Sequence, residues 1–149
     1  MDSQGKGRLL RCAGSAAWNM ALDESLLNST QPDSPVVLRL YGWNRPAVTL
    51  GRFQDAARAV DWELCRRKGI EVVRRPTGGR AVYHDTDLTF TLLFPEAAGG
   101  GHSIRESYGL VANALSRSFC RFGLDIQQGD PDRESVSSRS DCFAHVSLA

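Results

Sequence analysis

The sequence has few cysteines, almost no net charge and no long apolar run. Its four cysteines are widely spaced, without a Cys-x-x-Cys pair or a histidine at ligand spacing, so no structural metal site is expected. No apolar run approaches the roughly 18 residues of a membrane span, and the N-terminus lacks the apolar core of a signal peptide, which predicts a cytoplasmic protein with reduced thiols and no membrane contact. A net charge of +1 argues against binding to nucleic acid.

The composition is that of one globular domain. With 149 residues, 42% hydrophobic and 23% charged, the chain is long enough for one core and too short for two confident domains, so residues 1–149 are expected to form one globular domain or part of one. Basic residues concentrate between positions 66 and 80, which fits a small anionic ligand better than a polyanion. This cluster consists of Arg66, Arg67, Lys68, Arg74, Arg75 and Arg80.

Hydrophobic periodicity predicts two main helices. The first begins after an N-cap at Ser15 and runs to about Asn28. The apolar stripe expected to face the core consists of Trp18, Ala21, Leu22, Ser25 and Leu26. The second main helix begins with a capping box at Ser103 and Glu106 and ends at Gly123. A shorter helix is expected after Asp61, through Lys68.

Strands are predicted at 36–41, 47–50, 70–73 and 88–94, where β-branched or alternating apolar residues occur. In the last of these, the even-numbered residues are the large apolar ones, which predicts one strongly buried face. That face consists of Leu88, Phe90, Leu92 and Phe94. The stretch from Arg74 to Asp85 lies between the last two strands and is predicted to join them as a long hairpin.

The stretch 74–85 is also the strongest candidate for a ligand-binding loop. Gly78 and Gly79 allow positive φ angles and a close approach of backbone N–H groups to an anion, and Arg74 and Arg75 can pair with a carboxylate or phosphate. The alternative, a tight turn with solvated charges, stays open on these residues alone. Arg52, after the strand 47–50, is a second candidate, with an ordinary exposed loop residue as the alternative.

Five motifs, taken together and in this order, resemble the lipoate–protein ligase and octanoyltransferase superfamily, which shares the biotin/lipoate protein ligase catalytic domain. They are Trp18-Asn19-Met20-Ala21-Leu22-Asp23-Glu24; Arg39-Leu40-Tyr41-x-Trp43; Thr49-Leu50-Gly51-Arg52-Phe53-Gln54; the stretch Val72 to Asp85; and Asp141-Cys142-Phe143-Ala144. They span nearly the whole chain.

The resemblance implies an α/β (α+β) fold of the class II synthetase and biotin protein ligase type: a mixed, largely antiparallel sheet flanked by helices. It implies transfer of an octanoyl or lipoyl group to a lysine of a lipoyl carrier domain or of the glycine cleavage H protein. The acyl donor is octanoyl acyl carrier protein in the transferases. In the ligases it is free lipoate, activated by ATP with Mg through lipoyl-AMP. No tightly bound cofactor is expected.

The resemblance also assigns roles to residues. Thr77-Gly78-Gly79-Arg80, with Arg80 where ligases usually carry a third glycine, is more similar to the cysteine-dependent transferases, and Cys142 occupies the position of their acyl-thioester nucleophile. A thiolate is a good acyl acceptor and leaving group. The residues expected to bind substrate are Arg52, Arg74, Arg75, Gly78, Gly79, Arg80, Ala81, Val82, Tyr83 and His84.

His84 is expected to line the site, with a hydrogen-bonded structural histidine as the alternative. A catalytic pair with Asp85 is not expected, because neighbouring residues in a strand point to opposite faces.

Family members continue past Cys-Phe into a Gly-x-Lys-x-x-Gly-Ser-Ala segment whose lysine contacts the acyl carbonyl or adenylate phosphate. This sequence stops at Ala149 without such a lysine, so we expect an incomplete catalytic domain, either a truncated product or one completed by a second polypeptide. Loss of such a cation weakens transition-state stabilisation. A fragment that binds acyl groups or a lipoyl domain without turnover is therefore kept as an alternative to the two enzymes.

Overall fold

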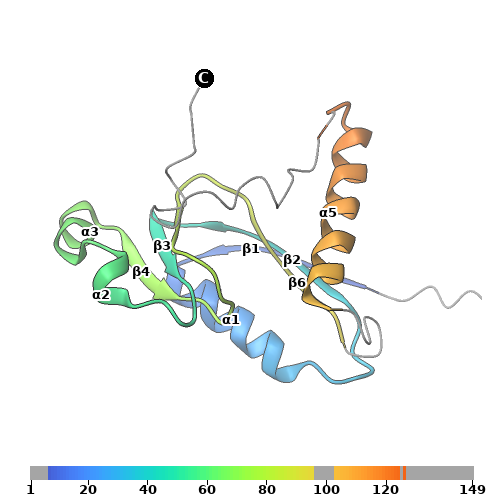
Figure 1. Ribbon diagram of the computed structural model, residues 1–149, viewed down its shortest axis with the longest axis horizontal. Helices are drawn as coiled ribbons and strands as arrows, with labels where there is room; N and C mark the ends of the chain where they lie inside the picture. The colour runs from blue at the N-terminus through green and yellow to red at the C-terminus, as the bar shows by residue number, and fades with distance from the viewer. Residues whose placement is uncertain (1–6, 96–102, 125, 127–149) are drawn as a thin grey trace, which may run out of the picture.

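The computed structural model describes residues 7–95, 103–124 and 126. Within them, six strands form two three-stranded sheets (Figure 1). In the first sheet the order is β1 (Arg8–Gly14), β2 (Val37–Trp43) and β6 (Thr89–Leu93). In the second sheet the order is β4 (Glu71–Arg74), β3 (Ala47–Leu50) and β5 (Val82–His84).

Each sheet contains one parallel and one antiparallel pair. β2 pairs parallel with β1 and antiparallel with β6; β3 pairs parallel with β4 and antiparallel with β5. A parallel pair needs a long crossover connection, usually helical. The chain supplies α1 (Ala16–Ser29) between β1 and β2, and α2 (Ala56–Ala59) with α3 (Trp62–Lys68) between β3 and β4. The predicted mixed α/β fold with flanking helices is confirmed.

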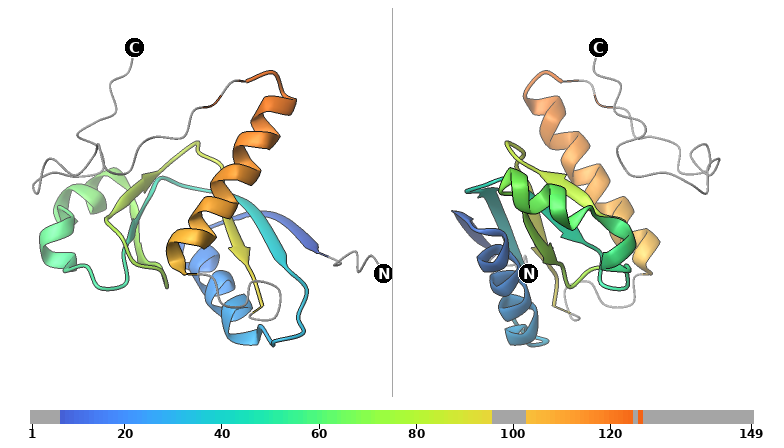
Figure 2. Two further views of the ribbon diagram at one scale, coloured as in Figure 1. Left: turned by 45° about the vertical axis from the view of Figure 1, so that its right-hand side comes forward. Right: turned by 90° about the vertical axis from the view of Figure 1, so that its left-hand side faces the viewer.

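The described helices begin and end at the signals that the sequence contains. Ser15 caps α1 by accepting from the Trp18 N–H, and α3 ends at Gly69 with a φ of 64°. The Ser103–Glu106 capping box opens α5 (Ile104–Arg121). α5 lies at the end of the molecule away from α2 and α3 (Figures 1 and 2). None of the described helices is long and apolar enough to cross a membrane.

The predicted hairpin between 70–73 and 88–94 is wrong, because β4 and β6 lie in different sheets. After β4, the chain crosses the end of β3 and returns as β5 on the other edge of β3. The cause is that β3 accepts hydrogen-bond partners on both edges. The segment 75–81 is therefore a crossing loop that lies over the end of β3, next to Gly51.

The predicted core face of α1 is also wrong. Trp18 is 47% exposed, Ala21 and Ser25 are exposed, and the buried positions are Ala16, Asn19, Met20 and Asp23. The reason lies on β2, where the fully buried Arg39 needs polar partners. Asp23 and Asn19 supply them, so α1 turns a half-polar face to the sheet.

Arg39 is the centre of a buried polar network. Its Nη1 donates to Asp23 Oδ1 at 2.6 Å and its Nη2 to Asn19 Oδ1 at 2.6 Å. Its Nε donates to Cys12 Sγ at 3.3 Å, and its guanidinium lies 3.8 Å from the Tyr41 ring centroid. The network joins β1, α1 and β2, and no described buried side-chain N or O atom is left without a partner.

The faces of β6 are exchanged relative to the prediction. Leu88, Phe90 and Phe94 are 72%, 40% and 42% exposed, whereas Leu93 is buried. Thr91, on the same face as Leu93, donates to Asp23 Oδ2 at 2.8 Å. The polar network beneath the sheet thus selects the threonine side of the strand, and the large apolar residues on the other face are left partly exposed.

Candidate functional site

A cleft of about 760 Å³ lies where α1, the ends of both sheets and α5 meet. One part of its wall is apolar, with Met20 and Leu27 from α1 and Phe90 and Leu92 from β6. Tyr108 of α5 also lines it. The other part contains Thr49, His84 and the loop from Arg75 to Gly79. The cleft therefore combines room for an apolar chain with a polar end.

The loop 75–81 fits closely onto Gly51. A Cβ atom at Gly51 would lie 1.9 Å from the carbonyl oxygen of Gly79, so no side chain fits there. The Arg52 N–H donates to the Thr77 carbonyl at 2.9 Å. Gly79 has a φ of 94°, a left-handed conformation that glycine adopts without strain. The positive φ expected within the diglycine occurs at Gly79.

Arg75 organises the loop from inside. Its Nη1 donates to the carbonyl and hydroxyl oxygens of Thr49 at 3.0 and 3.2 Å. Its Nη2 donates to the carbonyls of Gly78 and Arg80, both at 2.7 Å. Because C=O and N–H point in opposite directions in a trans peptide, the N–H groups of Gly79 and Ala81 are turned away from Arg75.

Arg74, a predicted anion-binding residue, makes hydrogen bonds to the turn after β3. Its Nη1 donates to the carbonyl oxygens of Gly51, Arg52 and Gln54 at 2.7, 3.1 and 2.9 Å. It thus fixes the turn after β3. Arg52 and Arg74 also line a smaller hollow of about 390 Å³ beside the cleft, together with Glu24 and Asn28 of α1.

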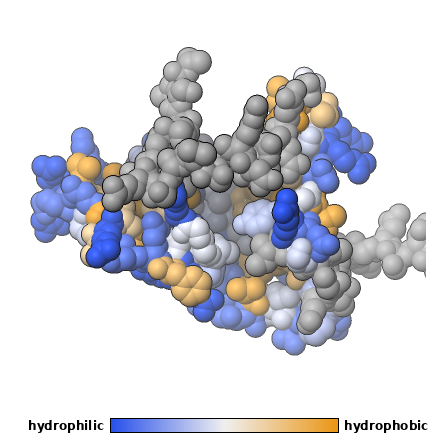
Figure 3. Space-filling view, in the orientation of Figure 1, coloured by the Kyte–Doolittle hydropathy of each residue, from blue (hydrophilic) through white to orange (hydrophobic). Residues whose placement is uncertain are grey.

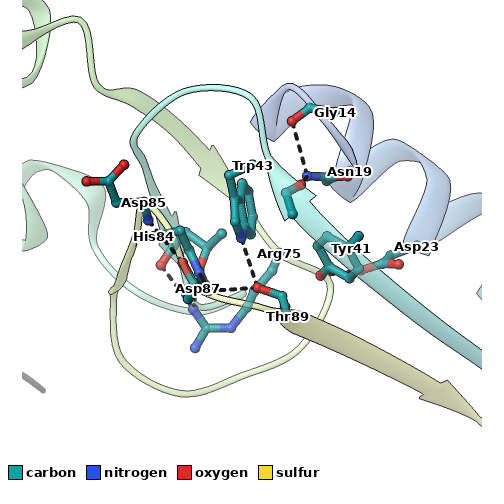
Figure 4. A network of polar contacts seen from close by, with 12 residues as sticks. Gly14, Asn19, Asp23, Tyr41, Trp43, Arg75, His84, Asp85, Asp87 and Thr89 are labelled. Carbon is teal, nitrogen blue, oxygen red and sulfur yellow. Dashed lines mark hydrogen bonds and ion pairs between the residues drawn. The ribbon is translucent and has the colours of Figure 1, made fainter. Parts of the chain in front are cut away.

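His84 is 7% exposed and lies between two partners. Its Nδ1 is 2.8 Å from Asp87 Oδ2, and its Nε2 is 3.1 Å from Thr49 Oγ1. The imidazole stacks on Trp43, with ring centroids 4.1 Å apart. Asp85 is exposed and points away from the imidazole (Figure 4). His84 is therefore both a cleft residue and a hydrogen-bonded histidine, and its carboxylate partner is Asp87.

Asp87 is held as an acceptor. Its Oδ1 accepts the Asp85 N–H at 2.9 Å, and its Oδ2 accepts the Thr89 hydroxyl at 2.9 Å. Burial raises the pKa of Asp87, but the hydrogen bonds from His84, Thr89 and the Asp85 amide outweigh it, so the pKa lies below its ordinary 3.8. Thr89 in turn accepts the Trp43 Nε1–H at 2.8 Å (Figure 4). The two sheets are linked through this carboxylate.

The buried network of α1 forms another part of the cleft wall. Tyr41 and Asp23 line the cleft, and the Tyr41 hydroxyl donates to Asp23 Oδ2 at 3.1 Å. Burial, together with the charge of Asp23, raises the pKa of Tyr41 to about 12. Tyr41 therefore stays protonated and serves as a hydrogen-bond donor at neutral pH.

Of the remaining predicted site residues, some line the cleft and others lie outside it. Val82 lines the cleft with Gly78 and Gly79, and Ala81 is half-buried in the loop. Tyr83 is 38% exposed and, next to His84 in β5, lies on the opposite face of the strand. Arg80 contributes its carbonyl to Arg75. Cys142 lies outside the described residues.

Sequence reasoning missed Asp87, Thr49 and Trp43. Asp87 could have been found, because it follows His84 by three positions just before a strand. Thr49 and Trp43 stand in two of the motifs, but no local signal places them beside His84, because the pairing of β3 with β5 and the ring contact between Trp43 and His84 bring them there.

Comparison with known proteins places this chain in a family. The profile of the lipoyl protein ligase A/B catalytic domain matches residues 15–144, which include both the loop and His84. The chain belongs to the lipoyl protein ligase A/B catalytic domain family.

Curated relatives in this family are similar along most of this chain. Octanoyltransferase LipM of Kyrpidia tusciae is 39% identical over 137 residues, covering 87% of this chain and 50% of the relative. Octanoyltransferase LipM of Bacillus subtilis is 34% identical over 140 residues, covering 87% of this chain and 49% of the relative. The chain thus spans about half the length of these relatives.

Solved lipoyl ligase structures share the fold. A lipoate-protein ligase A bound with ATP superposes with a TM-score of 0.73 at 32% identity, over 84% of this chain and 50% of that protein. Protein Ta0514 of Thermoplasma acidophilum with bound lipoic acid gives a TM-score of 0.76 at 31% identity, over 89% and 54%. A bi-partite lipoate protein ligase studied with its E2 lipoyl domain, from the same organism, gives 0.72 at 32% identity, over 84% and 49%.

Proposed function

We propose that this protein is an acyltransferase of protein lipoylation, which moves an octanoyl group onto a lysine of a lipoyl carrier domain. The observation that carries the proposal is the cleft, whose lining combines apolar residues with the Gly78-Gly79 loop. The similarity of the chain to octanoyltransferases LipM over most of its length supports octanoyl as the transferred group. The proposed acyl donor is octanoyl acyl carrier protein, and the acceptor is a lipoyl domain or a glycine cleavage H protein, in the cytoplasm.

In this proposal the acyl chain lies along Met20, Phe90 and Leu92, with its carbonyl near the loop. Apolar burial of the chain drives binding, at about 0.8 kcal/mol for each buried CH₂ group. The N–H groups of Gly79 and Ala81, turned away from Arg75, are candidate donors to the carbonyl oxygen as it gains negative charge.

The proposed chemistry has two acyl transfers. The Cys142 thiolate attacks the donor thioester, which forms an enzyme thioester and releases the carrier thiol. The lysine amine then attacks this thioester, so the amide C–N bond forms, the C–S bond breaks, and the amine proton leaves with the regenerated thiol or solvent.

Intact mass spectrometry tests this chemistry. The protein is incubated with octanoyl acyl carrier protein, and then with a lipoyl domain. We expect a single octanoyl adduct that Cys142→Ser abolishes and that Cys120→Ser, an exposed cysteine on α5, retains. Transfer that survives Cys142→Ser contradicts the thioester route.

An ATP-dependent lipoate–protein ligase is the second candidate, supported by the similar structures that hold ATP and lipoic acid. Incubation with lipoate, ATP and Mg should then produce lipoyl-AMP without any acyl carrier protein. Binding of octanoate without either product favours the non-catalytic alternative, a protein that holds the acyl group without turnover.

A further inference from the structure

A hydrogen-bond chain runs from the loop to the turn between β5 and β6. Arg75 Nη1 lies 3.2 Å from Thr49 Oγ1, Thr49 Oγ1 lies 3.1 Å from His84 Nε2, and His84 Nδ1 lies 2.8 Å from Asp87 Oδ2. Its four members come from the ends of β3, β4 and β5 and from the turn before β6. Thr49 is 2% and His84 7% exposed, so bulk water does not compete strongly for the hydrogen bond between them.

The two ends of the chain fix its direction. A guanidinium can only donate, and an ionised carboxylate can only accept. Arg75 therefore donates to Thr49, and His84 Nδ1–H donates to Asp87. With a neutral imidazole, the Thr49 hydroxyl then donates to His84 Nε2. The other neutral tautomer would place the Nδ1 lone pair against a carboxylate oxygen at 2.8 Å, which is repulsive. Asp87 thus determines which nitrogen of His84 carries the proton.

The imidazole has little freedom to turn. It stacks on Trp43 at 4.1 Å with an angle of 21° between the ring planes. The Thr89 hydroxyl accepts from the Trp43 Nε1–H at 2.8 Å and donates to Asp87 Oδ2 at 2.9 Å. Thr89 of β6 therefore holds both the Trp43 indole and the Asp87 carboxylate, two of the groups that contact the imidazole. The orientation and tautomer of His84 are therefore fixed. Its Nε2 in turn restricts the hydroxyl of Thr49, which restricts the guanidinium of Arg75.

We propose that Asp87 and His84 are positioning residues of the acyl site, acting through Thr49 and Arg75 on the loop 77–81. Arg75 holds the carbonyls of Gly78 and Arg80, and the tautomer of His84 keeps the Thr49 hydroxyl proton off the side from which Arg75 donates. The loop then presents its N–H groups in one arrangement. This role rests on the proposed function for its catalytic consequence, whereas the arrangement of the loop is independent of it.

The test compares Asp87→Asn with Asp85→Asn in the full-length protein. Asp85 is a matched control, because it is an exposed carboxylate two positions away whose backbone N–H, not its side chain, contacts Asp87. ¹⁵N NMR of the His84 ring should show the Nδ1–H tautomer in the wild type and in Asp85→Asn, and loss of its predominance in Asp87→Asn. Amide hydrogen exchange at residues 77–81 should accelerate about tenfold in Asp87→Asn only.

Thr49→Val removes the hydroxyl link while keeping the shape of the side chain, and Thr49→Ser restores the link. We expect Val to reproduce the faster loop exchange with the His84 tautomer unchanged, and Ser to return the exchange to the wild-type rate. In octanoyl transfer, Asp87→Asn and Thr49→Val should lower kcat about tenfold with KM for the acyl donor within about twofold.

The outcomes separate the two proposals. Unchanged loop exchange in both Asp87→Asn and Thr49→Val overturns the positioning role, whatever the wild type transfers. A wild-type protein that neither binds octanoate nor transfers it overturns the proposed function. The tautomer and exchange measurements then still decide whether the hydrogen-bond chain orders the loop. Should Asp87→Asn fail to fold, Thr49→Val against Thr49→Ser decides alone.

Discussion

At the scale of single residues, the interior is held by a charged pair rather than by apolar contacts alone. Arg39 is fully buried, and Asp23, 6% exposed, neutralises it while also accepting from Tyr41 and Thr91. Removing one partner of a buried pair leaves an uncompensated charge, which costs more than the pair contributes.

We expect Asp23→Ala to lower the free energy of unfolding by about 3–5 kcal/mol, because it leaves the Arg39 guanidinium without its carboxylate. Urea unfolding monitored by tryptophan fluorescence measures it. The control is Glu24→Ala, an exposed carboxylate next along the same helix, for which a change within about 0.5 kcal/mol is expected. Equal losses in the two variants would contradict the role of the buried pair.

Asp87 makes the free energy of unfolding decrease as the pH falls through the acid range. Its pKa is below 3.8 in the folded protein, so the folded state binds fewer protons than the unfolded state between the two pKa values. The stabilisation is fully present above the unfolded value and is lost as pH falls through the folded value. Because the Asp87 side chain is 42% exposed, solvent screening keeps the effect small.

Unfolding titrations at several pH values between about 5 and about 2 measure this dependence. We expect the free energy of unfolding of Asp87→Asn to fall less steeply with acidification than that of the wild type, with Asp85→Asn following the wild type. Parallel curves for wild type and Asp87→Asn would show that the carboxylate keeps its ordinary pKa when folded.

At the scale of elements, the decisive feature is how the 75–81 loop seats on the end of β3. Gly51 is required for that contact, since a Cβ would overlap the Gly79 carbonyl at 1.9 Å and must displace backbone. Overpacking of this kind costs typically about 1–3 kcal/mol.

Gly51→Ala should therefore destabilise the protein by about 1–3 kcal/mol and reduce octanoyl transfer in the folded fraction, because the loop must move away from β3. Thermal unfolding and the mass-spectrometric assay measure the two effects. Gly42→Ala is the control, because a Cβ there has its nearest neighbour at 3.9 Å. A Gly51→Ala protein with wild-type stability would mean that the loop yields without cost.

Two elements show why amphipathic patterns mislead here. The apolar stripe of α1 and the large residues of β6 were predicted to face the core, and both lie on partly exposed faces. In each case a buried polar residue reversed the preference: Asp23 faces Arg39, and Thr91 faces Asp23. A pattern of hydrophobicity contains no information about a charge buried on another strand.

At the scale of the whole molecule, exposed hydrophobic side chains gather on α5 and around the cleft. Tyr108 and Phe122 are 73% and 82% exposed, and hydrophobic residues show on the surface over α5 (Figure 3). Tyr108 also belongs to the cleft. An acyl chain that enters the cleft would cover part of this surface and link α1, β6 and α5.

Octanoate should therefore raise the melting temperature, because a ligand that binds only the folded state stabilises it by about 2.7 kcal/mol at a concentration of 100 Kd. Butyrate, which carries the same charge but a shorter chain, is the control and should have a smaller effect at equal concentration. Differential scanning fluorimetry measures both. Equal shifts for the two ligands would assign the effect to the carboxylate and not to the apolar wall. Phe90→Ser should reduce the shift caused by octanoate and leave the shift caused by butyrate unchanged.

Local chemistry in the sequence determined the ends of the helices, the positions of most strands and the glycine-rich loop. Ser15, Gly69 and the Ser103–Glu106 box act through neighbours within four residues, and such contacts are encoded locally. The motif order also indicated the family, through the residues that the profile matches.

Only the tertiary structure decided which contacts residues 74–85 make. The sequence supplied Arg74, Arg75 and His84 as ligand candidates, but their hydrogen bonds go largely to the protein itself, to carbonyls around Gly51, to Thr49 and to Asp87. Those partners are brought together because β3 takes β4 on one edge and β5 on the other, and because Trp43 stacks on His84 from the other sheet. Strand pairing depends on contacts between residues far apart in the sequence, so no local pattern can determine it.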